Sequence, residues 1–162
     1  MIPFSPSPPF PFNATVHRIQ VERASARGIM ERIVVKSSPI HGQGVFAARR
    51  IEAAEVIIDW SECSEVLSDE AVKALPAEER IFVSIIDGEN VLFKPPARFV
   101  NHSCNPNARA CDGHDIAIRV IEAGEEITVD YVAEQVPGLR LECKCKAPNC
   151  RGLLIVPSRP TP

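Results

Sequence analysis

Three cysteines close together near the C-terminal end have the clearest chemical potential in this chain. Cys143, Cys145 and Cys150 form the pattern Cys-x-Cys-x-x-x-x-Cys. Thiolates at this spacing can surround one tetrahedral ion, but three ligands leave a structural zinc site one short. The competing interpretation is a set of unrelated buried thiols. The fourth ligand must come from elsewhere, and the candidates are the histidines, Cys63, Cys104 and Cys111.

A polar run in the middle of the chain is the second unusual feature. Residues 98–107 are Arg-Phe-Val-Asn-His-Ser-Cys-Asn-Pro-Asn, with apolar sequence before them. Asn, His and Ser side chains are costly to bury unless their polar atoms find partners. The run is therefore more specific than an ordinary loop, and it contributes Asn101, His102 and Cys104 as candidate binding residues.

Two shorter segments add further candidates. Residues 41–46, His-Gly-Gln-Gly-Val-Phe, contain paired glycines that let a ligand approach the backbone closely. A glycine turn between two strands explains them equally well, and the following helix and third glycine of a dinucleotide-binding motif are missing. Residues 124–131, Gly-Glu-Glu-Ile-Thr-Val-Asp-Tyr, place the only tyrosine, Tyr131, at the end of a strand-like run.

Short β-rich runs must position these residues, because such runs between turn signals dominate the chain. Asp87-Gly88 predicts a type I′ hairpin, in which glycine adopts a positive φ without steric cost. Residues 111–114 and 122–125 predict two further tight turns. We expect strands over residues 32–36, 44–47, 55–60, 80–86, 90–94, 107–111, 115–121 and 126–131.

One helix is expected after residue 68. Ser68 is a good N-cap, the two acidic residues that follow it suit the helix dipole, and Leu67 can pack on Val72. Pro76 ends this helix. Strands do not alternate with long helices, so the sequence predicts a mostly β fold rather than a doubly wound one.

Composition bounds the possible functions. The 162 residues are 45% hydrophobic and 24% charged, as in one folded domain. The net charge of −3 argues against a dedicated nucleic-acid-binding domain. No apolar run approaches the ~20 residues that span a bilayer. The N-terminus, MIPFSPSPPF, does not resemble a signal peptide, so we expect an intracellular protein, cytoplasmic in a bacterium or nuclear in a eukaryote.

Proline and charge are both unevenly distributed along the chain. Five prolines fall within residues 1–11 and three within residues 157–162, so both ends are expected to be weakly ordered tails. Residues 59–89 contain nine acidic residues against two basic ones. This segment is either a solvated surface or a surface that attracts a basic partner.

Together, these segments resemble the SET-domain family of protein lysine methyltransferases with its post-SET zinc element. The matching segments occur in the family's order, and the most specific are Asn-His-Ser-Cys-x-Pro-Asn and Cys-x-Cys-x-x-x-x-Cys-Arg-Gly. The resemblance implies a tail at residues 1–29, a SET domain at 30–134, a post-SET segment at 135–156 and a tail at 157–162. No pre-SET cysteine cluster precedes this domain. The implied fold is mostly β, with several small sheets, little helix and a threaded, pseudoknot-like C-terminal segment.

The resemblance also implies roles for individual residues. Tyr131 is expected to be the catalytic tyrosine at the mouth of the lysine channel. One structural zinc ion is expected on Cys104, Cys143, Cys145 and Cys150. The methyl donor S-adenosylmethionine is expected to bind Gly42, Gln43, Gly44, Val45, Asn101, His102, Tyr131 and Leu153. The implied substrate is a lysine in a basic protein, such as a histone or a histone-like protein, with no nucleic acid or membrane as partner.

The chemistry of methyl transfer agrees with this assignment. The reaction needs a neutral amine, whereas free lysine has a pKa of about 10.4. A narrow apolar channel and a cationic cofactor disfavour the ammonium form, so we expect no dedicated base and a rate that depends mostly on alignment.

Two departures from the family pattern concern the lysine channel. Many members carry further tyrosines there, but this chain has only Tyr131, so its wall must come from Trp60, Phe82, Phe93 or Phe99. Val129 stands where Phe or Tyr is common in the family. The alternative function is a SET scaffold that keeps zinc and cofactor but binds a partner without turnover. The intact Asn101-His102 motif and Tyr131 favour the enzyme.

Overall fold

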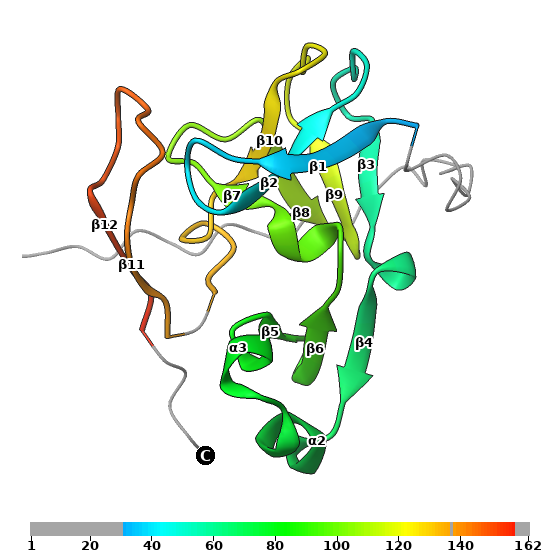
Figure 1. The fold of residues 1–162 in the computed structure, drawn as a ribbon, viewed down its shortest axis with the longest axis vertical. Helices are drawn as coiled ribbons and strands as arrows, with labels where there is room; N and C mark the ends of the chain where they lie inside the picture. The colour runs from blue at the N-terminus through cyan, green and yellow to red at the C-terminus, as the bar shows by residue number, and fades with distance from the viewer. Residues whose placement is uncertain (1–30, 137, 158–162) are drawn as a thin grey trace, which may run out of the picture.

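The computed structural model describes residues 31–136 and 138–157. The predicted tail at residues 1–29 lies outside the described residues, as does all of the C-terminal tail except Pro157. Within the described part, strands in several small sheets make up most of the regular structure, with two short α-helices (Figure 1). The prediction of a mostly β fold with little helix is confirmed. The described helices are all too short to cross a membrane.

The central sheet brings the sequence motifs together. Its strands are β1 (Ile33–Ser37), β2 (Gln43–Ala47), β10 (Glu126–Val129) and β7 (Asn101–His102), in that order across the sheet. β10 pairs antiparallel with β2 and parallel with β7, where Thr128 lies opposite Asn101 and Val129 opposite His102. This parallel pairing places the polar run beside the segment that ends in Tyr131.

A second sheet supports the central one. It contains β3 (Val56–Asp59), β9 (His114–Ala117) and β8 (Ala108–Cys111), in the order β3-β9-β8. One apolar core connects the two sheets, because the buried side chains of β1, β2, β3, β8, β9 and β10 belong to one cluster. Its fully buried isoleucines are Ile51, Ile57, Ile58, Ile121 and Ile127.

A third sheet forms a separate lower part of the molecule in Figure 1. It contains β4 (Ser64–Leu67), β6 (Glu89–Phe93) and β5 (Val83–Ile86), together with the helices α2 (Asp69–Ala74) and α3 (Ala77–Arg80). The 3-10 helix η1 (Trp60–Glu62) leads from β3 into this part, and η2 (Ala97–Phe99) leads from it to β7. The acidic segment at residues 59–89 therefore forms most of this part of the molecule.

A short hairpin of β11 (Arg140–Glu142) and β12 (Leu153–Ile155) lies to one side of the central sheet (Figure 1). Leu154 on β12 is fully buried, whereas Leu141, Leu153 and Ile155 are exposed. The segment that connects the two strands carries the three cysteines of the C-terminal motif. The hairpin therefore presents that motif to the end of β7.

Several sequence predictions are confirmed locally. Ser68 caps α2, and its hydroxyl accepts a hydrogen bond from the Ala71 N–H over 3.2 Å. The hairpin at Asp87-Gly88 has φ values of 51° and 87°, as a type I′ turn requires. The expected strand over residues 115–121 is shorter, since β9 ends at Ala117.

The prediction for residues 80–86 as one strand is wrong. The first of these residues ends α3, whose N-cap is Pro76, and β5 begins only at Val83. Pro76 therefore lies between two short helices, after α2 and as the N-cap of α3. β4, β7, β11 and β12 were not predicted, because they are short strands with mostly polar or exposed side chains.

Candidate active site and metal centre

Asn101 joins the glycine turn to the central sheet. Its amide group donates to the carbonyl oxygens of His41 (3.2 Å) and Gln43 (2.9 Å) and to Oε1 of Glu126 (2.8 Å). A Cβ atom at Gly44 would overlap the same Glu126 carboxylate, so any other residue there would force that carboxylate to move. The turn and the polar run, predicted separately, form one unit with Glu126 between them.

A cavity of about 280 Å³ opens beside this unit. Of the eight predicted cofactor residues, Asn101, His102 and Tyr131 line it, whereas Gly42, Gln43 and Gly44 do not. Val45 is fully buried in the core, and Leu153 lies opposite Glu142 in the β11–β12 ladder, outside the cavity wall. The other lining residues are Ile40, His41, Leu141, Glu142, Cys143 and Lys144.

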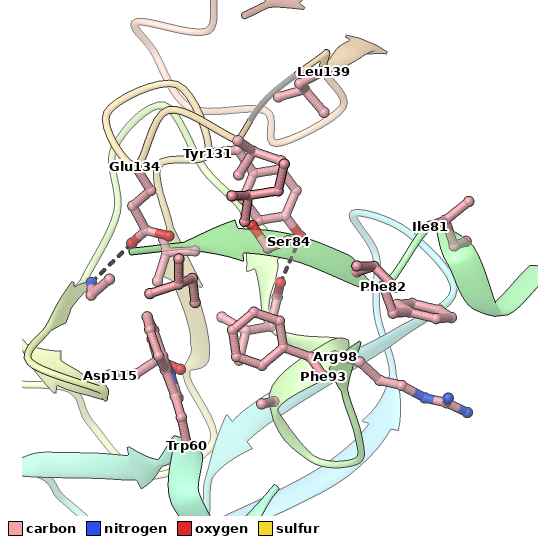
Figure 2. Close-up of a pocket in the computed structure, with 18 of the residues that line it drawn as sticks. Trp60, Ile81, Phe82, Ser84, Phe93, Arg98, Asp115, Tyr131, Glu134 and Leu139 are labelled. Atoms are coloured by element: carbon pink, nitrogen blue, oxygen red, sulfur yellow. Dashed lines mark hydrogen bonds between the residues drawn. The ribbon is translucent and has the colours of Figure 1, made fainter. Parts of the chain in front are cut away.

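A second cavity, of about 540 Å³, contains the aromatic side chains expected around a lysine channel (Figure 2). Trp60, Phe82 and Phe93 line it, but Phe99 does not. The rings of Trp60 and Phe93 pack edge to face, with 5.2 Å between their centroids. The residues of β5 form another part of the wall.

Tyr131 is the single described residue that lines both cavities. Its hydroxyl donates to the carbonyl oxygen of Val100 over 2.7 Å, and its backbone N–H donates to Nδ1 of His102 over 3.2 Å. Burial, with the nearby charges of Glu134 and Asp115, raises the pKa of Tyr131 far above its ordinary value. The hydroxyl therefore stays protonated at neutral pH and cannot act as a base.

Two carboxyl groups that the sequence did not single out lie at one end of the larger cavity, beside Trp60 (Figure 2). Asp115, on β9, is 5% exposed, and Glu134 accepts a hydrogen bond from the Ala110 N–H over 2.9 Å. Burial and the charge of Glu134 raise the pKa of Asp115 to about 7. Burial also raises the pKa of Glu134.

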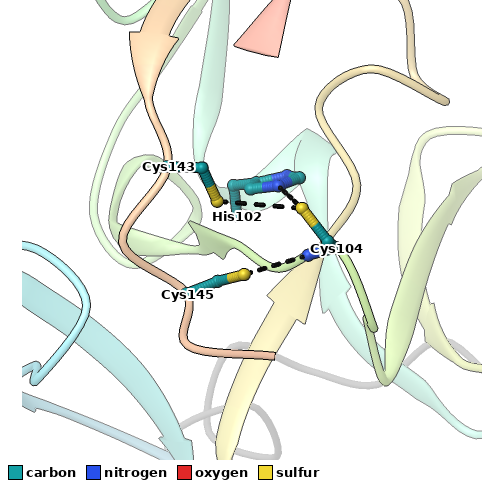
Figure 3. A group of neighbouring side chains, drawn as sticks. All are labelled: His102, Cys104, Cys143 and Cys145. Carbon is teal, nitrogen blue, oxygen red and sulfur yellow. Dashed lines mark hydrogen bonds between the residues drawn. The ribbon is translucent and has the colours of Figure 1, made fainter. Parts of the chain in front are cut away.

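Four side chains from two distant segments converge on one point (Figure 3). The possible ligand atoms of His102, Cys104, Cys143 and Cys145 all lie within 4.8 Å of one another. The sulfurs of Cys104 and Cys143 are 3.7 Å apart. Two sulfurs at ~2.3 Å from one tetrahedral zinc ion lie roughly 3.8 Å apart. The sulfur spacing therefore fits a zinc ion.

Cys150, the remaining predicted ligand, is not one of these four residues, and His102 takes its place in the group. The sulfur of Cys150 is 3.8 Å from the carbonyl oxygen of Cys143. Burial and the neighbouring thiols raise the pKa of Cys143 to about 12. The pKa of Cys145 is lowered to about 6. Burial acts to raise this pKa, but the N–H groups of Cys104 and Ala147 and the neighbouring thiols of Cys143 and Cys150 outweigh it. A cluster that stabilises a thiolate at neutral pH suits a metal cation.

His102 is oriented by the residues on both sides of its ring. Because Nδ1 accepts the Tyr131 N–H, the proton of the neutral ring must sit on Nε2. Nε2 is 3.2 Å from the sulfur of Cys104, and burial lowers the pKa of His102, which keeps the ring neutral. In this tautomer Nε2 donates to the sulfur and has no free lone pair for a metal ion.

The cysteine-bearing segment is also attached to the core without metal. Arg151 makes a bidentate ion pair with Asp130, with distances of 2.9 and 2.7 Å. The side-chain amide of Asn149 donates to the carbonyl oxygen of Cys104 over 2.7 Å. These contacts were not predicted from the sequence, because they join segments about twenty and forty-five residues apart.

Comparisons with known proteins match the same segments. The family model described as SET domain matches residues 42–132. The chain is 33% identical over 142 residues to a histone-lysine N-methyltransferase, H3 lysine-4 specific, of Debaryomyces hansenii, which covers 72% of this chain and 12% of that protein. It is 32% identical over 152 residues to the histone-lysine N-methyltransferase set1 of Dictyostelium discoideum. This alignment covers 81% of this chain and 10% of that protein.

A human relative and one solved structure extend this comparison. Histone-lysine N-methyltransferase 2B of Homo sapiens is 33% identical over 140 residues, covering 76% of this chain and 5% of that protein. The chain thus spans about a tenth or less of these relatives' lengths. A crystal structure assigned as a Plasmodium falciparum histone methyltransferase superposes with a TM-score of 0.51 at 22% identity, covering 62% of this chain and 92% of that one. At 22% identity, this likeness shows a shared fold and nothing more.

Proposed function

Because this chain belongs to the SET-domain family, we propose that it transfers a methyl group from S-adenosylmethionine to a lysine side chain of a basic protein. One observation carries the proposal: Tyr131 lines two otherwise separate cavities and is the single described residue to do so. A donor in one cavity and an acceptor in the other would meet at this ring. A scaffold that only binds partners has no need of such a junction.

The smaller cavity is the proposed cofactor site. When bound, S-adenosylmethionine supplies a methyl group on a positively charged sulfur. The carbonyl oxygens of His41 and Gln43 and the carboxylate of Glu126 surround the Asn101 amide, which has only two hydrogens for these three acceptors. A cationic amino group matches such a set of oxygens. Leu141 adds an apolar surface to the same cavity.

The larger cavity is the proposed lysine pocket. The hydrogen of the Tyr131 hydroxyl is committed to the carbonyl oxygen of Val100. The lone pairs of the phenol oxygen are therefore left to accept a hydrogen bond from the substrate amine. That contact would orient the amine toward the smaller cavity, and alignment of this kind can supply a large part of the rate.

The cysteine cluster is the proposed structural zinc site, with Cys104, Cys143, Cys145 and Cys150 as ligands. His102 would support it as a hydrogen-bond donor to the sulfur of Cys104. Because Cys143 also lines the smaller cavity, an ion at this place would fix one wall of the cofactor site. The zinc would have no part in the chemical step.

The proposed substrate is a histone or another basic protein. The acidic segment at residues 59–89 includes β5, and β5 lines the lysine pocket. Opposite charge favours encounter with a basic protein. The names of the similar proteins, which describe histone-lysine methyltransferases, support the same choice.

A labelling experiment tests the proposal. The protein is incubated with S-adenosylmethionine carrying a deuterated methyl group and with mixed core histones, and labelled methyl-lysine is measured by mass spectrometry. We expect labelled lysine with the wild-type protein and none after heat inactivation. Tight cofactor binding without labelled lysine on histones or other basic proteins would favour the scaffold instead.

A further inference from the structure

The Asp115 carboxyl group is buried at the end of the larger cavity. β9 is the middle strand of its sheet, and Asp115 lies opposite Ile58 and Ala110 in the two ladders. The side chain of Trp60 supplies the one donor that acts on the carboxyl group. A carboxylate can accept about four hydrogen bonds, so a single donor leaves it free to bind a further partner. The cavity is where that partner can enter.

The surroundings of Asp115 suit an alkylammonium ion. The rings of Trp60 and Phe93 offer aromatic surfaces of the kind that attract organic cations. Glu134 adds a second carboxyl group on the same cavity wall. In Figure 2, Trp60, Asp115 and Glu134 lie together at the end away from Ile81 and Arg98. A lysine side chain that enters the cavity would bring its charged end to these groups.

A lysine that arrives as ammonium must lose a proton before it can attack a methyl group. The sequence alone suggested that burial makes a dedicated base unnecessary, but it did not reveal a carboxyl group inside the pocket. We infer that Asp115 is the proton acceptor for the substrate lysine, an inference that rests on the proposed function.

An N–H bond of the ε-ammonium group breaks and an O–H bond forms on Asp115, which leaves a neutral amine and a neutral acid. The amine nitrogen then bonds to the methyl carbon while the carbon–sulfur bond breaks, and the sulfur keeps that electron pair. The product is a methylammonium ion, and Asp115 returns its proton to solvent when the product leaves.

The energetics of this transfer follow from the position of Asp115. The nearby charge of Glu134, added to burial, strengthens Asp115 as a base and brings its pKa to about 7. Burial in the same pocket lowers the pKa of the lysine. The two values therefore approach each other, so the transfer costs less than it would in water. The other titratable groups near Asp115 are Tyr131 and Cys63, which both remain protonated at neutral pH because their pKa values are raised.

The first test is the pH dependence of kcat/KM on core histones for the wild type, Asp115→Asn and Asp112→Asn. Asp112 is a matched control, because it lies in the exposed β8–β9 turn with φ 48°, a conformation that Asn tolerates. We expect the wild-type and Asp112→Asn profiles to level off above pH ~7. Asp115→Asn should be lower by ~10²-fold near neutral pH and should keep rising about tenfold per pH unit toward the pKa of lysine.

Two failures are distinguishable in this test. An active protein in which the Asp115→Asn profile runs parallel to that of the wild type overturns the role of Asp115 alone. No methyl transfer by the wild type overturns the proposed function and, with it, the proton transfer.

A second test needs no turnover. Trp60 is the only tryptophan of the chain, so its fluorescence reports on this cavity. Titration with n-butylammonium chloride should change the fluorescence, with affinity increasing as pH rises through ~7 and Asp115 ionises. Asp115→Asn should weaken binding at least tenfold at pH 8, and Asp112→Asn should leave it unchanged. Equal affinity in all three proteins would overturn the inference.

Discussion

Tyr131 and Val100 are joined by a hydrogen bond of 2.7 Å from the phenol hydroxyl to the backbone carbonyl oxygen. Val100 comes just before β7, and Tyr131 comes two residues after β10 ends. The bond therefore links the two parallel strands at the site where they approach both cavities. It fixes the ring, and it leaves the oxygen lone pairs free for a substrate amine. The predictions below follow from this arrangement and from the groups around it.

Loss of the metal should weaken cofactor binding without unfolding the core. Cys145→Ser, or chelation of the wild type, should remove about one zinc per chain and reduce S-adenosylmethionine affinity by roughly tenfold, because one wall of the smaller cavity is released. The ion pair of Arg151 with Asp130 should keep the segment near the core. Metal analysis and calorimetric titration measure both effects. Cys111→Ser, outside the cluster, is the control, and equal losses in both variants would contradict the site.

The identity of the fourth zinc ligand can be decided by a pair of substitutions. His102 donates from Nε2 in the structure, so His102→Gln should retain the zinc ion. Cys150→Ser should lose it, because only three thiolates would remain. The zinc content of the purified variants gives the answer. The opposite pattern would show that the group of His102 with three cysteines is the true ligand set.

Gly44 is required by close contact with Glu126. Gly44→Ala should force the carboxylate away from Asn101 and so disturb the turn at the smaller cavity. We expect S-adenosylmethionine to bind at least tenfold more weakly, as measured by calorimetry. Gly88→Ala is the matched control, since it strains a positive-φ turn in the third sheet but has open space around its Cβ position. An equal loss of affinity in the two variants would refute the special role of the turn.

Asp115 should make the protein less stable as the pH rises from about 4 to about 7. Its pKa is raised from 3.8 to about 7 in the folded state, so over this range the folded chain holds a proton that the unfolded chain has lost. The free energy of unfolding therefore falls with rising pH. Asp115→Asn removes this dependence, and urea unfolding should show it to be more stable than the wild type by a few kcal/mol at pH 8 but not at pH 4. A difference that is constant with pH would count against the buried carboxyl group.

The sequence was sufficient for the features that depend on local order. Asp87-Gly88 and the Ser68 cap are encoded by neighbouring residues, and both are present as predicted. The polar run also predicted Asn101 and His102 as binding residues, because polar side chains are rarely buried without hydrogen-bonding partners. Both side chains do line the smaller cavity.

The remaining features depend on contacts between distant segments. Asp115 was predicted only as part of a strand, and the alternation of β9 was the one local sign that it points inward. The raised pKa of Asp115 depends in part on the charge of Glu134, in the segment after β10. No local pattern in the sequence reveals that these two residues lie close together. Likewise, the role of Glu126 appears only when the glycine turn and the polar run lie side by side.

The central claim is that Tyr131 aligns a lysine with the methyl donor, and the rate of methyl transfer by Tyr131→Phe tests it most directly. The variant keeps the ring but loses the bond to the Val100 carbonyl oxygen, so the free energy of unfolding should fall by only about 1 kcal/mol. S-adenosylmethionine should bind with nearly unchanged affinity. We predict that kcat for methylation of core histones falls by ~10²-fold or more. A folded variant that binds cofactor and methylates histones at the wild-type rate would contradict the account.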